Sequence, residues 1–420
     1  MKICVLGLGY IGLPTAVMLA SAGHDVIGVD IKQDVLSAVG NGNSHIDEPG
    51  LDELLKEAVY SGKLRTSSAP VQSDAFIIAV PTPLNGKSAI RNPKSEVPSA
   101  DLSFVKVAAT SIAPILRRDN LVVLESTSPP GTTEEVLVTI LEKESGLKAG
   151  EDFYVAYCPE RVLPGRILHE IVHNARIIGG IDSESAERAE KLYSSFVKGE
   201  IYITDARTAE MVKLAENTFR DLNIAFANEL SRICHRLGVN VWEVIQLANR
   251  HPRVNILKPG PGVGGHCIAV DPWFIVEKAP QEARLIRTAR EVNDSQPQYI
   301  FERIKELVGD IERPKIAVMG VAYKGNVGDT RESPALRIVD LLKKNGYEVS
   351  IYDPYVEGYE SVEGVFDDAD CIVLLTAHDL FRELSPKLIS ISVRGKIVFD
   401  TKSLLDREKW ESAGFEVETL

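Results

Sequence analysis

Lys2-Ile-Cys-Val-Leu-Gly-Leu-Gly-Tyr-Ile-Gly12 is the stretch of sequence that decides the fold. A short apolar run leads directly into three glycines, and a helical pattern follows over residues 13–22. A second apolar run, Asp25-Val-Ile-Gly-Val29, ends at Asp30. This order of strand, glycine turn, helix and strand predicts a dinucleotide-binding unit, in which a pyrophosphate lies against the N-terminus of the helix.

The acidic residue after the second strand selects the dinucleotide. Asp30 stands about 20 residues after the glycines, where a carboxylate accepts hydrogen bonds from a ribose 2′-hydroxyl and repels a 2′-phosphate. The motif therefore favours NAD over NADP. Two other interpretations are a tight turn in an ordinary strand–helix unit and a secretory signal peptide. The glycines, the polar end of the second strand and the lack of a small-residue cleavage site count against the signal peptide.

The rest of the chain shows three regions. Residues 1–204 alternate between strands and helices and predict an NAD-binding Rossmann domain, with buried parallel strands at 76–80, 121–124, 153–156 and 176–178. Residues 205–313 read as helices, expected at 206–237, 241–249 and 281–308. Residues 314–420 alternate again, with strands expected at 315–319, 348–352, 371–375 and 396–399. The expected fold class is α/β, with two Rossmann-like doubly wound parallel-sheet domains joined by a central all-helical domain with a long connecting helix.

The C-terminal domain has a turn of its own at the equivalent place. Gly320-Val-Ala-Tyr323 stands where a dinucleotide fingerprint would be, so we expect this domain to bind a different nucleotide. Two nucleotide-type domains around a helical middle imply two nucleotide ligands.

Composition restricts the possible partners and compartments. The 420-residue chain is 44% hydrophobic and carries a net charge of −13, which argues against nucleic acid and anionic membrane surfaces as partners. No apolar run is long enough to span a bilayer. Five cysteines are scattered without paired spacing, which favours free thiols in a reducing cytoplasm.

The segment Gly260-Pro-Gly-Val-Gly-Gly-His-Cys-Ile-Ala-Val-Asp-Pro-Trp273 carries the chemistry. It places Cys267 on a glycine-rich turn, four residues before Asp271. Glycines allow a ligand to approach the backbone closely, and a thiol in that position can act as a nucleophile. The plain alternative is a loop with a small apolar cysteine. A hydride acceptor together with a nucleophilic thiol is the pairing needed to oxidise an aldehyde through a thioester.

Hydroxyl groups follow two of the expected strands. Thr127 lies in Glu125-Ser-Thr-Ser-Pro-Pro-Gly-Thr-Thr133, directly after a buried strand, and Thr82 follows another. Open sheets bind ligands at the carboxyl ends of their strands, so both side chains are expected near the cofactor. The alternative is a Pro-Gly turn capped by hydroxyls.

Three further groups of polar residues are candidates. Lys213, Asn217 and Arg220 share one helix face, which is either a solvated stripe or, in a cleft, a site that activates a thiol and stabilises an oxyanion. Glu160 and Arg161 are a proton-transfer group and a substrate ligand, or an exposed ion pair. His251 and Arg253 stand near the cysteine, and an arginine there suits a carboxylate or phosphate.

One motif is a decoy. His169-Glu-Ile-Val-His173 matches the zinc-protease pattern, but that chemistry needs a helix of several turns and a third ligand. Pro164 and Gly165 lie just upstream, and a strand is expected three residues downstream. We therefore expect no metal site.

With these residues in place, the chain resembles the UDP-sugar 6-dehydrogenase family over essentially its whole length. The segments that carry the resemblance are Gly7–Gly12, Glu125–Thr133, Pro159–Arg161, Lys213–Asn217, Gly264–Cys267 with Asp271, Gly320–Gly325 and Arg331–Pro334. Ala248–Leu257 and Gly262–Phe274 look like the branch that oxidises UDP-N-acetylmannosamine. The glucose branch usually has a lysine-containing segment after its cysteine, and the N-acetylglucosamine branch usually has proline where this chain has Ala269.

The resemblance implies roles for the matching residues. NAD would contact Gly7, Gly9, Tyr10, Ile11, Gly12, Asp30, Thr82, Thr127 and Arg331. The UDP-sugar would contact Arg161, Val162, Lys213, Asn217, Arg220, His251, Arg253, Gly262, Tyr323, Lys324 and, from the C-terminal domain, Lys402. Substrate loops of this family can come from a second subunit, which implies a homodimer or a higher homo-oligomer. The product would enter a surface polysaccharide or a related glycoconjugate.

The expected reaction is a four-electron oxidation of the sugar C6 hydroxymethyl to a carboxylate with two NAD+. Cys267 would be the nucleophile, Lys213 or a water held by Asp271 the base, and Lys213 with Asn217 the oxyanion ligands. Glu160 or Asp271 would activate the hydrolytic water, and the catalytic set is completed by Thr127. The alternatives are UDP-N-acetylglucosamine or UDP-glucose as substrate, a two-electron β-hydroxyacid dehydrogenase, an NAD-binding sensor without turnover, and a zinc hydrolase.

Overall fold

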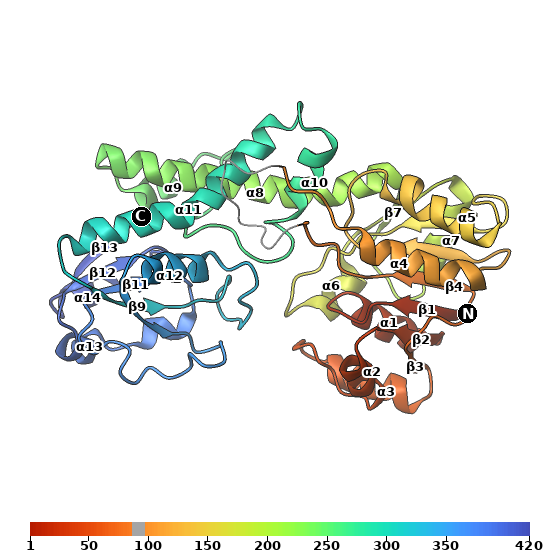
Figure 1. The fold of residues 1–420 in the computed structure, drawn as a ribbon, viewed down its shortest axis with the longest axis horizontal. Coiled ribbons are helices and arrows are strands. Elements are labelled where there is room, and N and C mark those ends of the chain that lie inside the picture. Colours follow the sequence, from red (N-terminus) through yellow and green to blue (C-terminus); the bar gives the residue numbers. More distant parts are fainter. Residues whose placement is uncertain (86–96) are drawn as a thin grey trace. The chain divides into compact units, whose positions relative to one another are not determined.

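The computed structural model describes residues 1–85 and 97–420. The described chain divides into two compact units, the first formed by residues 1–85 and 98–216 and the second containing residues 217–420. The border between the units falls inside one long helix, α8 (Ala206–Leu237). Figure 1 shows a sheet flanked by helices in each unit.

The first unit is built on a sheet that has eight strands among the described residues, in the order β3-β2-β1-β4-β5-β6-β7-β8. The strands are β1 (Lys2–Leu6), β2 (Asp25–Val29), β3 (Leu64–Ser67), β4 (Ala75–Ile78), β5 (Leu121–Leu124), β6 (Tyr154–Tyr157), β7 (Arg176–Gly180) and β8 (Ile201–Asp205). Strands β1 to β6 are parallel. The predicted buried strands are thus confirmed to within a residue or two, whereas β3 and β8 were not expected.

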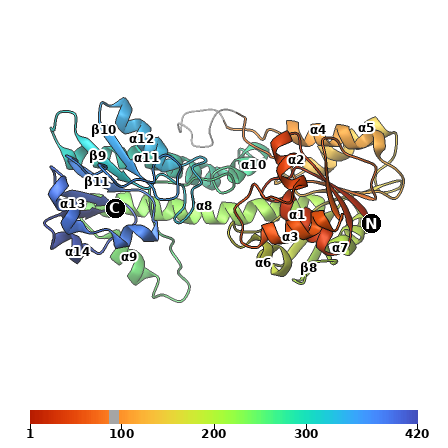
Figure 2. The same cartoon turned by 90° about the horizontal axis from the view of Figure 1, so that it is seen from below.

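Helices cover both faces of this sheet because side chains alternate along each strand. Ile3 and Val5 of β1 face a core that also contains α1, α2, α3, α6 and α7, whereas Cys4 and Leu6 face a core formed with α4 and α5. Figure 2 shows α4 and α5 on one side of the sheet and α1, α3 and α7 on the other. The helices are α1 (Gly12–Ser21), α2 (Gln33–Gly40), α3 (Leu51–Tyr60), α4 (Ser103–Ile112), α5 (Thr139–Ser145), α6 (Ile167–His173) and α7 (Ser183–Tyr193).

Strand β7 corrects one prediction. The run at 176–178 is a strand, but β7 pairs with β6 in the antiparallel direction and with β8 in the parallel direction. The connection from β6 to β7, residues 158–175, contains α6 and is long enough for either direction, so its length does not explain the reversal. Because β7 runs antiparallel to β6, its first residue, Arg176, lies at the carboxyl edge of β5 and β6, where ligands bind in such sheets.

The helical middle of the chain agrees with the sequence prediction at α8 and at α9 (Val241–Ala248), while α11 (Arg284–Val308) begins three residues later than expected. A further helix, α10 (Asp271–Lys278), was not expected, because the glycines before it suggested a loop. Asp271 and Pro272 in its first turn are residues that favour a helix start, the carboxylate through the helix dipole and proline through its fixed φ.

The second unit contains a five-stranded parallel sheet, counted over the described residues, in the order β10-β9-β11-β12-β13. One face packs against α12 and the helical segment, and the other against α13 and α14. The second Rossmann-like sheet is confirmed, although β13 was not anticipated. The bounds are β9 (Lys315–Met319), α12 (Pro334–Lys344), β10 (Glu348–Tyr352), β11 (Cys371–Leu374), α13 (Pro386–Ser392), β12 (Ile397–Asp400), α14 (Arg407–Glu411) and β13 (Glu416–Thr419).

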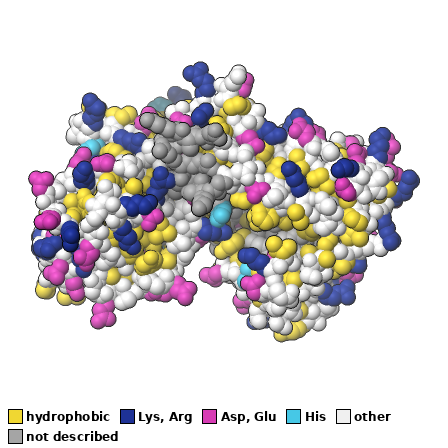
Figure 3. Space-filling model, in the orientation of Figure 1, with side chains coloured by type: hydrophobic (Ala, Val, Ile, Leu, Met, Phe, Trp, Pro, Cys, Tyr) yellow, Lys and Arg dark blue, Asp and Glu magenta, His cyan; other side chains and the backbone are white. Residues whose placement is uncertain are grey.

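The surface is charged with both signs. Basic and acidic side chains are interspersed over the face drawn in Figure 3. Within residues 1–85 and 97–420, none of the helices has the length and apolar character that crossing a membrane would require.

Candidate active site

The glycine turn after β1 fits a dinucleotide. Gly7 has a φ of +92°, and a Cβ on Gly12 would meet the Gly7 carbonyl oxygen at 1.8 Å, so both positions require glycine. A Cβ on Gly9 would meet no protein atom within 4 Å, so this side of the turn is open to a ligand. No side chain caps the N-terminus of α1, which leaves its N–H groups for an anion.

Asp30 stands at the carboxyl end of β2, as predicted. Its Oδ2 accepts a hydrogen bond from Leu8 N at 2.9 Å, and its Oδ1 accepts one from Lys32 N at 3.0 Å. The carboxylate is thereby fixed beside the glycine turn, with lone pairs left for a ribose hydroxyl. Gly7, Gly9, Gly12 and Asp30 form one cradle that suits NAD.

The loops after β4 and β5 are joined by hydrogen bonds from two hydroxyl groups, one of them the hydroxyl of the predicted Thr82. Thr82 Oγ1 donates to the carbonyl of Thr127 at 2.6 Å, and Ser126 Oγ donates to the carbonyl of Val80 at 2.7 Å. Thr82 and Thr127 therefore lie together at the ligand-binding edge of the sheet. Tyr10 is exposed and Ile11 half-buried in the glycine turn.

The loop after β6 is fastened to α8. Arg161 pairs with Glu216, its Nε lying 3.0 Å from Oε2 and its Nη2 2.5 Å from Oε1, and its Nη1 donates to the Ala175 carbonyl at 2.7 Å. Glu216 is three residues after Lys213 on the helix, so these contacts hold the Glu160–Arg161 segment one turn from that lysine. Val162 packs against the core of the first unit.

In the second unit, the Cys267 side chain is exposed, whereas the other four cysteines of the chain are buried. Burial raises the pKa of Cys4 to about 11 and the pKa values of Cys158 and Cys371 to about 12. The thiolate is the nucleophilic form, so these buried thiols are poor nucleophiles. Among the thiols, the geometry thus points to Cys267.

Asp271 lies between Cys267 and α8. Its backbone N donates to the Cys267 carbonyl at 2.8 Å, and its Oδ2 accepts a hydrogen bond from Asn217 Nδ2 at 2.5 Å. The Asp271 side chain is buried. The structure therefore brings together three of the predicted catalytic residues: the thiol-bearing turn, the carboxylate and the amide of α8.

The glycines of the turn let other predicted residues approach it. A Cβ on Gly264 would meet the Glu332 carbonyl oxygen at 2.6 Å and Tyr323 Cβ at 2.8 Å. Gly265, with a φ of +82°, donates through its N–H to the Arg331 carbonyl at 3.1 Å. Tyr323 and Arg331 accordingly border the Cys267 turn.

Two more predicted residues belong to this region. Gly262, whose φ is +137°, lies against Asn293 and Pro334. The Lys402 side chain packs against Gly260 at the start of the turn, and burial lowers the pKa of this lysine to about 8.

The start of the turn is held by a polar network that the sequence did not indicate. Gly260 N donates to Asn228 Oδ1, and Asn228 Nδ2 donates to Asn293 Oδ1, each at 2.9 Å. Asn293 Nδ2 in turn donates to Asp221 Oδ1 at 2.8 Å. Asparagines at these helix positions carry no motif, so nothing in a single sequence distinguishes them from solvated ones.

Four predicted substrate ligands are exposed, namely Arg220, His251, Arg253 and Lys324. His251 and Arg253 lie together in one loop, where Arg253 N donates to His251 Nδ1 at 3.3 Å. Their exposure leaves their side chains available to a ligand.

The second nucleotide-type turn is occupied by protein groups. Asp353, at the end of β10, accepts hydrogen bonds through Oδ2 from Val321 N at 2.7 Å and Ala322 N at 3.0 Å. His378 Nδ1 accepts from Asn326 N at 2.8 Å, so its Nε2 carries the proton and donates to Asp353 at 3.1 Å. The Oδ1 of Asp353 also accepts a hydrogen bond from Tyr355 N at 3.1 Å, so with four donors Asp353 has little capacity left for a ribose, in contrast to Asp30.

The His169–His173 motif forms only the short helix α6. The two rings are stacked with centroids 4.5 Å apart, and His173 Nδ1 lies 2.9 Å from the His169 carbonyl oxygen. Within residues 1–85 and 97–420, no group of three His, Cys, Asp or Glu side chains is arranged to hold a metal ion.

Comparison with known proteins agrees with this geometry. Residues 1–197, 207–295 and 317–407 match the NAD-binding, central and UDP-binding domains of the UDP-glucose/GDP-mannose dehydrogenase family. The chain is 50% identical to a UDP-N-acetyl-D-mannosamine dehydrogenase of Methanococcus maripaludis, over 100% of this chain and 96% of that protein. It is also 50% identical to an NDP-N-acetyl-D-galactosaminuronic acid dehydrogenase of Ralstonia nicotianae, with 96% of each covered.

A solved structure extends the likeness to the whole fold. The UDP-D-ManNAc dehydrogenase from Pyrococcus horikoshii matches with a TM-score of 0.91 and 46% identity, over 100% of this chain and 99% of that one. The resemblance found in the sequence is thereby confirmed, and so is the NAD-binding character of the first domain. The chain belongs to the UDP-glucose/GDP-mannose dehydrogenase family.

Proposed function

We propose that this protein is a UDP-N-acetyl-D-mannosamine 6-dehydrogenase, which oxidises the C6 hydroxymethyl of the sugar to a carboxylate. The observation that carries the proposal is the exposed Cys267 on a glycine turn whose carbonyl is bonded to Asp271, the partner of Asn217. The high identity to mannosamine dehydrogenases over the full chain supports the choice of sugar.

NAD+ supplies the hydride acceptor in the cradle of Gly7, Gly9, Gly12 and Asp30, with contacts from Tyr10, Ile11, Thr82, Thr127 and Arg331. The chain's own residues manage protons and charge. Lys213, or a water held by Asp271, removes the C6 hydroxyl proton as the hydride leaves carbon, which yields an aldehyde. The Cys267 thiolate adds to this aldehyde, and loss of the second hydride leaves a thioester. Lys213 and Asn217 stabilise the oxyanions.

Hydrolysis completes the reaction. A water activated by Glu160 or Asp271 attacks the thioester carbonyl, the carbon–sulfur bond breaks, and the electron pair returns to Cys267. In sum, one CH2OH group, two NAD+ and one water give one carboxylate, two NADH and three protons. Thioester hydrolysis makes the overall reaction effectively irreversible.

The first test is the ratio of NADH formed to UDP-N-acetylmannosamine consumed by the purified protein. Two NADH per sugar are expected, because the thioester route requires two hydride transfers before release. One NADH per sugar would mean that the reaction ends at the aldehyde and that Cys267 is not the nucleophile. Parallel assays with UDP-N-acetylgalactosamine, UDP-N-acetylglucosamine and UDP-glucose test the choice of substrate. Activity with only one of these three would make that UDP-sugar the substrate in place of UDP-N-acetylmannosamine.

The UDP-sugar ligands in this proposal are the residues that the family resemblance implies. Arg161, Val162, Tyr323, Lys324, Gly262 and Lys402 come from one subunit, while Arg220, His251 and Arg253 are offered to a neighbouring subunit. A loop of exposed basic residues suits the phosphates of a substrate that another copy binds. The functional form is therefore a homodimer or a higher homo-oligomer.

An apolar stripe on α8 supports the oligomer. Phe219, Phe226 and Ile233 are exposed at seven-residue intervals, which places them along one side of the helix. Replacing Phe226 by glutamate is expected to give monomers in light-scattering measurements, because a charge on the stripe would be desolvated in the interface. The matched control is Ile391→Glu on α13, an exposed apolar residue of the same unit that lies outside the stripe. An unchanged mass for the Phe226 variant would reject this interface.

We also assign the enzyme to the cytoplasm, since its five free thiols suit a reducing compartment. Its division into domains at residues 1–204, 205–313 and 314–420 remains our proposal. A product that carries an acidic sugar suits the synthesis of a surface polysaccharide or related glycoconjugate.

A further inference from the structure

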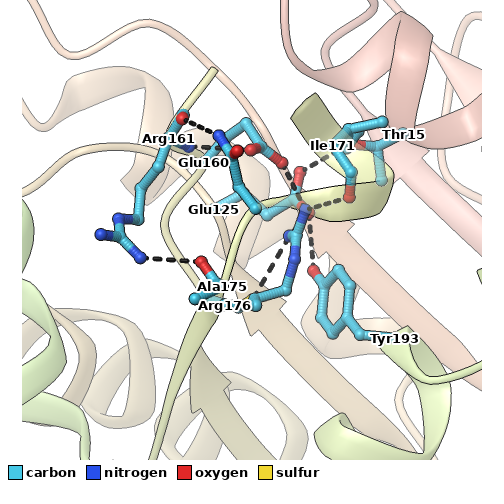
Figure 4. Close-up of polar contacts among 10 residues, drawn as sticks. Thr15, Glu125, Glu160, Arg161, Ile171, Ala175, Arg176 and Tyr193 are labelled. Carbon is cyan, nitrogen blue, oxygen red and sulfur yellow. Dashed lines mark hydrogen bonds and ion pairs between the residues drawn. The ribbon is translucent and has the colours of Figure 1, made fainter. Parts of the chain in front are cut away.

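A buried polar cluster stands at the carboxyl edge of the first sheet (Figure 4). Arg176 Nη2 lies 2.6 Å from Glu160 Oε2, and Arg176 Nη1 lies 4.0 Å from Glu125 Oε1. Glu125 also accepts hydrogen bonds from Tyr193 Oη at 2.6 Å and from Thr15 Oγ1 at 3.2 Å. The cluster thus joins a proposed catalytic residue, Glu160, to groups that the proposed reaction does not use.

The reversed direction of β7 creates this cluster. The antiparallel register pairs Ala156 with Gly180 and Tyr157 with Gly179. Extending this register past the end of β6 places Arg176 opposite Glu160. A parallel β7 would have put Arg176 at the opposite edge of the sheet, so the contact depends on the strand reversal.

Of the two carboxyl groups in the cluster, Glu160 is the one that forms the close ion pair with Arg176. Desolvation by burial, together with the charge of Glu160, raises the pKa of Glu125 to about 7 and outweighs the attraction of Arg176. Burial likewise raises the pKa of Cys158 to about 12 and the pKa of Tyr193 well above its ordinary value. Glu160, whose Oε2 lies 2.6 Å from Arg176 Nη2, is therefore the carboxylate in closest contact with the guanidinium.

Burying an ion pair costs desolvation free energy, so the fold alone gives little reason for this contact. Arg176 and Glu160 side chains are only 4% and 5% exposed, and a buried ion pair often stabilises a fold no better than apolar residues would. The second oxygen of the carboxylate, Oε1, accepts a hydrogen bond from Arg161 N at 2.8 Å. Two fixed donors, Arg161 N and Arg176 Nη2, therefore set the orientation of the Glu160 carboxylate.

We propose that Arg176 is a positioning residue of the proposed dehydrogenase, which keeps the Glu160 carboxylate ionised and correctly oriented for hydrolysis of the thioester. The inference rests on the proposed function, since it assigns to Glu160 the activation of water. Arg176 acts through Glu160 and needs no contact with the substrate. The Arg176 guanidinium also lies over the Tyr193 ring, with its central carbon 4.8 Å from the ring centroid. This cation–π contact restricts the orientation of the guanidinium further.

The test is the pH dependence of kcat in the variant Arg176→Met, measured on the full-length enzyme. Without its counter-ion, the buried Glu160 is expected to be protonated at neutral pH. We expect kcat to fall about 100-fold at pH 7 with KM changed by less than about threefold, and to recover as the pH is raised. Because hydrolysis becomes slow, the Cys267 acyl-enzyme should accumulate and be seen by intact-mass spectrometry.

Two variants separate positioning from folding. Arg176→Lys keeps the charge and is expected to restore most of kcat without the alkaline shift, even if the methionine variant is poorly folded. Tyr193→Phe removes a hydrogen bond from the same buried cluster but leaves the Arg176–Glu160 contact, so it should lower stability without moving the pH profile.

A pH profile of Arg176→Met that parallels wild type, or a drop in kcat without acyl-enzyme, would overturn the proposal. The failure of the proposed function is a separate result. It would appear as a wild-type enzyme that does not oxidise UDP-N-acetylmannosamine, and the same profiles are then recorded with whichever UDP-sugar wild type oxidises.

Discussion

Replacing Cys267 by serine is expected to lower the steady-state rate of NADH formation by about 1,000-fold or more. A serine hydroxyl is not ionised near neutral pH, so it neither adds readily to the aldehyde nor leaves easily from an ester. The first hydride transfer does not need the thiol, and the variant should therefore form at most one NADH per sugar. The measurement is the NADH progress curve under single-turnover conditions.

The controls for this substitution follow from the burial of the other cysteines. Cys267→Ser should bind NAD+ with unchanged affinity in calorimetry, because the cofactor cradle lies in the first unit. Cys234→Ser serves as the matched exchange at a buried thiol of the same unit and should keep two NADH per sugar. Full formation of the acid by Cys267→Ser would exclude the thioester route.

Replacing Asp271 by asparagine is expected to lower kcat by about 100- to 1,000-fold. This carboxylate is buried, receives the Asn217 amide at 2.5 Å, and begins the helix that follows Cys267. Asparagine keeps the size but removes the charge that holds a proton-accepting water. Loss of a carboxylate from the first turn of α10 should cost only about 0.3–1 kcal/mol of stability.

The double variant Asn217→Asp with Asp271→Asn tests whether activity depends on the position of the carboxylate or only on its presence. It restores a carboxylate–amide pair between α8 and α10, so thermal stability should return toward that of wild type. The charge now stands on the other helix, away from the Cys267 backbone, and kcat should remain low. If the double variant regains activity, the location of the carboxylate is unimportant and our assignment of Asp271 is wrong.

The sequence predicted the elements whose pattern is local. The glycines after β1, Asp30 at the end of β2 and the apolar runs of both sheets rest on short-range rules, and all lie where they were expected. The direction of β7 is different in kind. The apolar run of Arg176–Gly180 suits either direction, and the connection from β6 is long enough for both, so nothing local in the sequence indicates the reversal.

The same contrast holds for the active site. Cys267, Asp271 and Asn217 could be predicted as candidates because a thiol, a carboxylate and a helix-face amide are recognisable chemistry, and hydrogen bonds connect Asp271 to the other two residues. Asn228, Asn293 and Arg176 were missed, because a buried polar residue is identified by its tertiary partner rather than by its neighbours in sequence. Each of them holds a predicted residue or its loop in place.

Because the cysteines differ in burial, a thiol reagent should label the native enzyme at a single position. A maleimide dye added to the folded protein should react with Cys267, because the remaining four thiols are buried. Stoichiometric labelling would count functional centres in a preparation without any engineered tag, and bound nucleotide sugar would slow the reaction by covering the turn. Because Cys267 is the nucleophile in the proposed mechanism, modification of this one thiol by an electrophile should inactivate the enzyme.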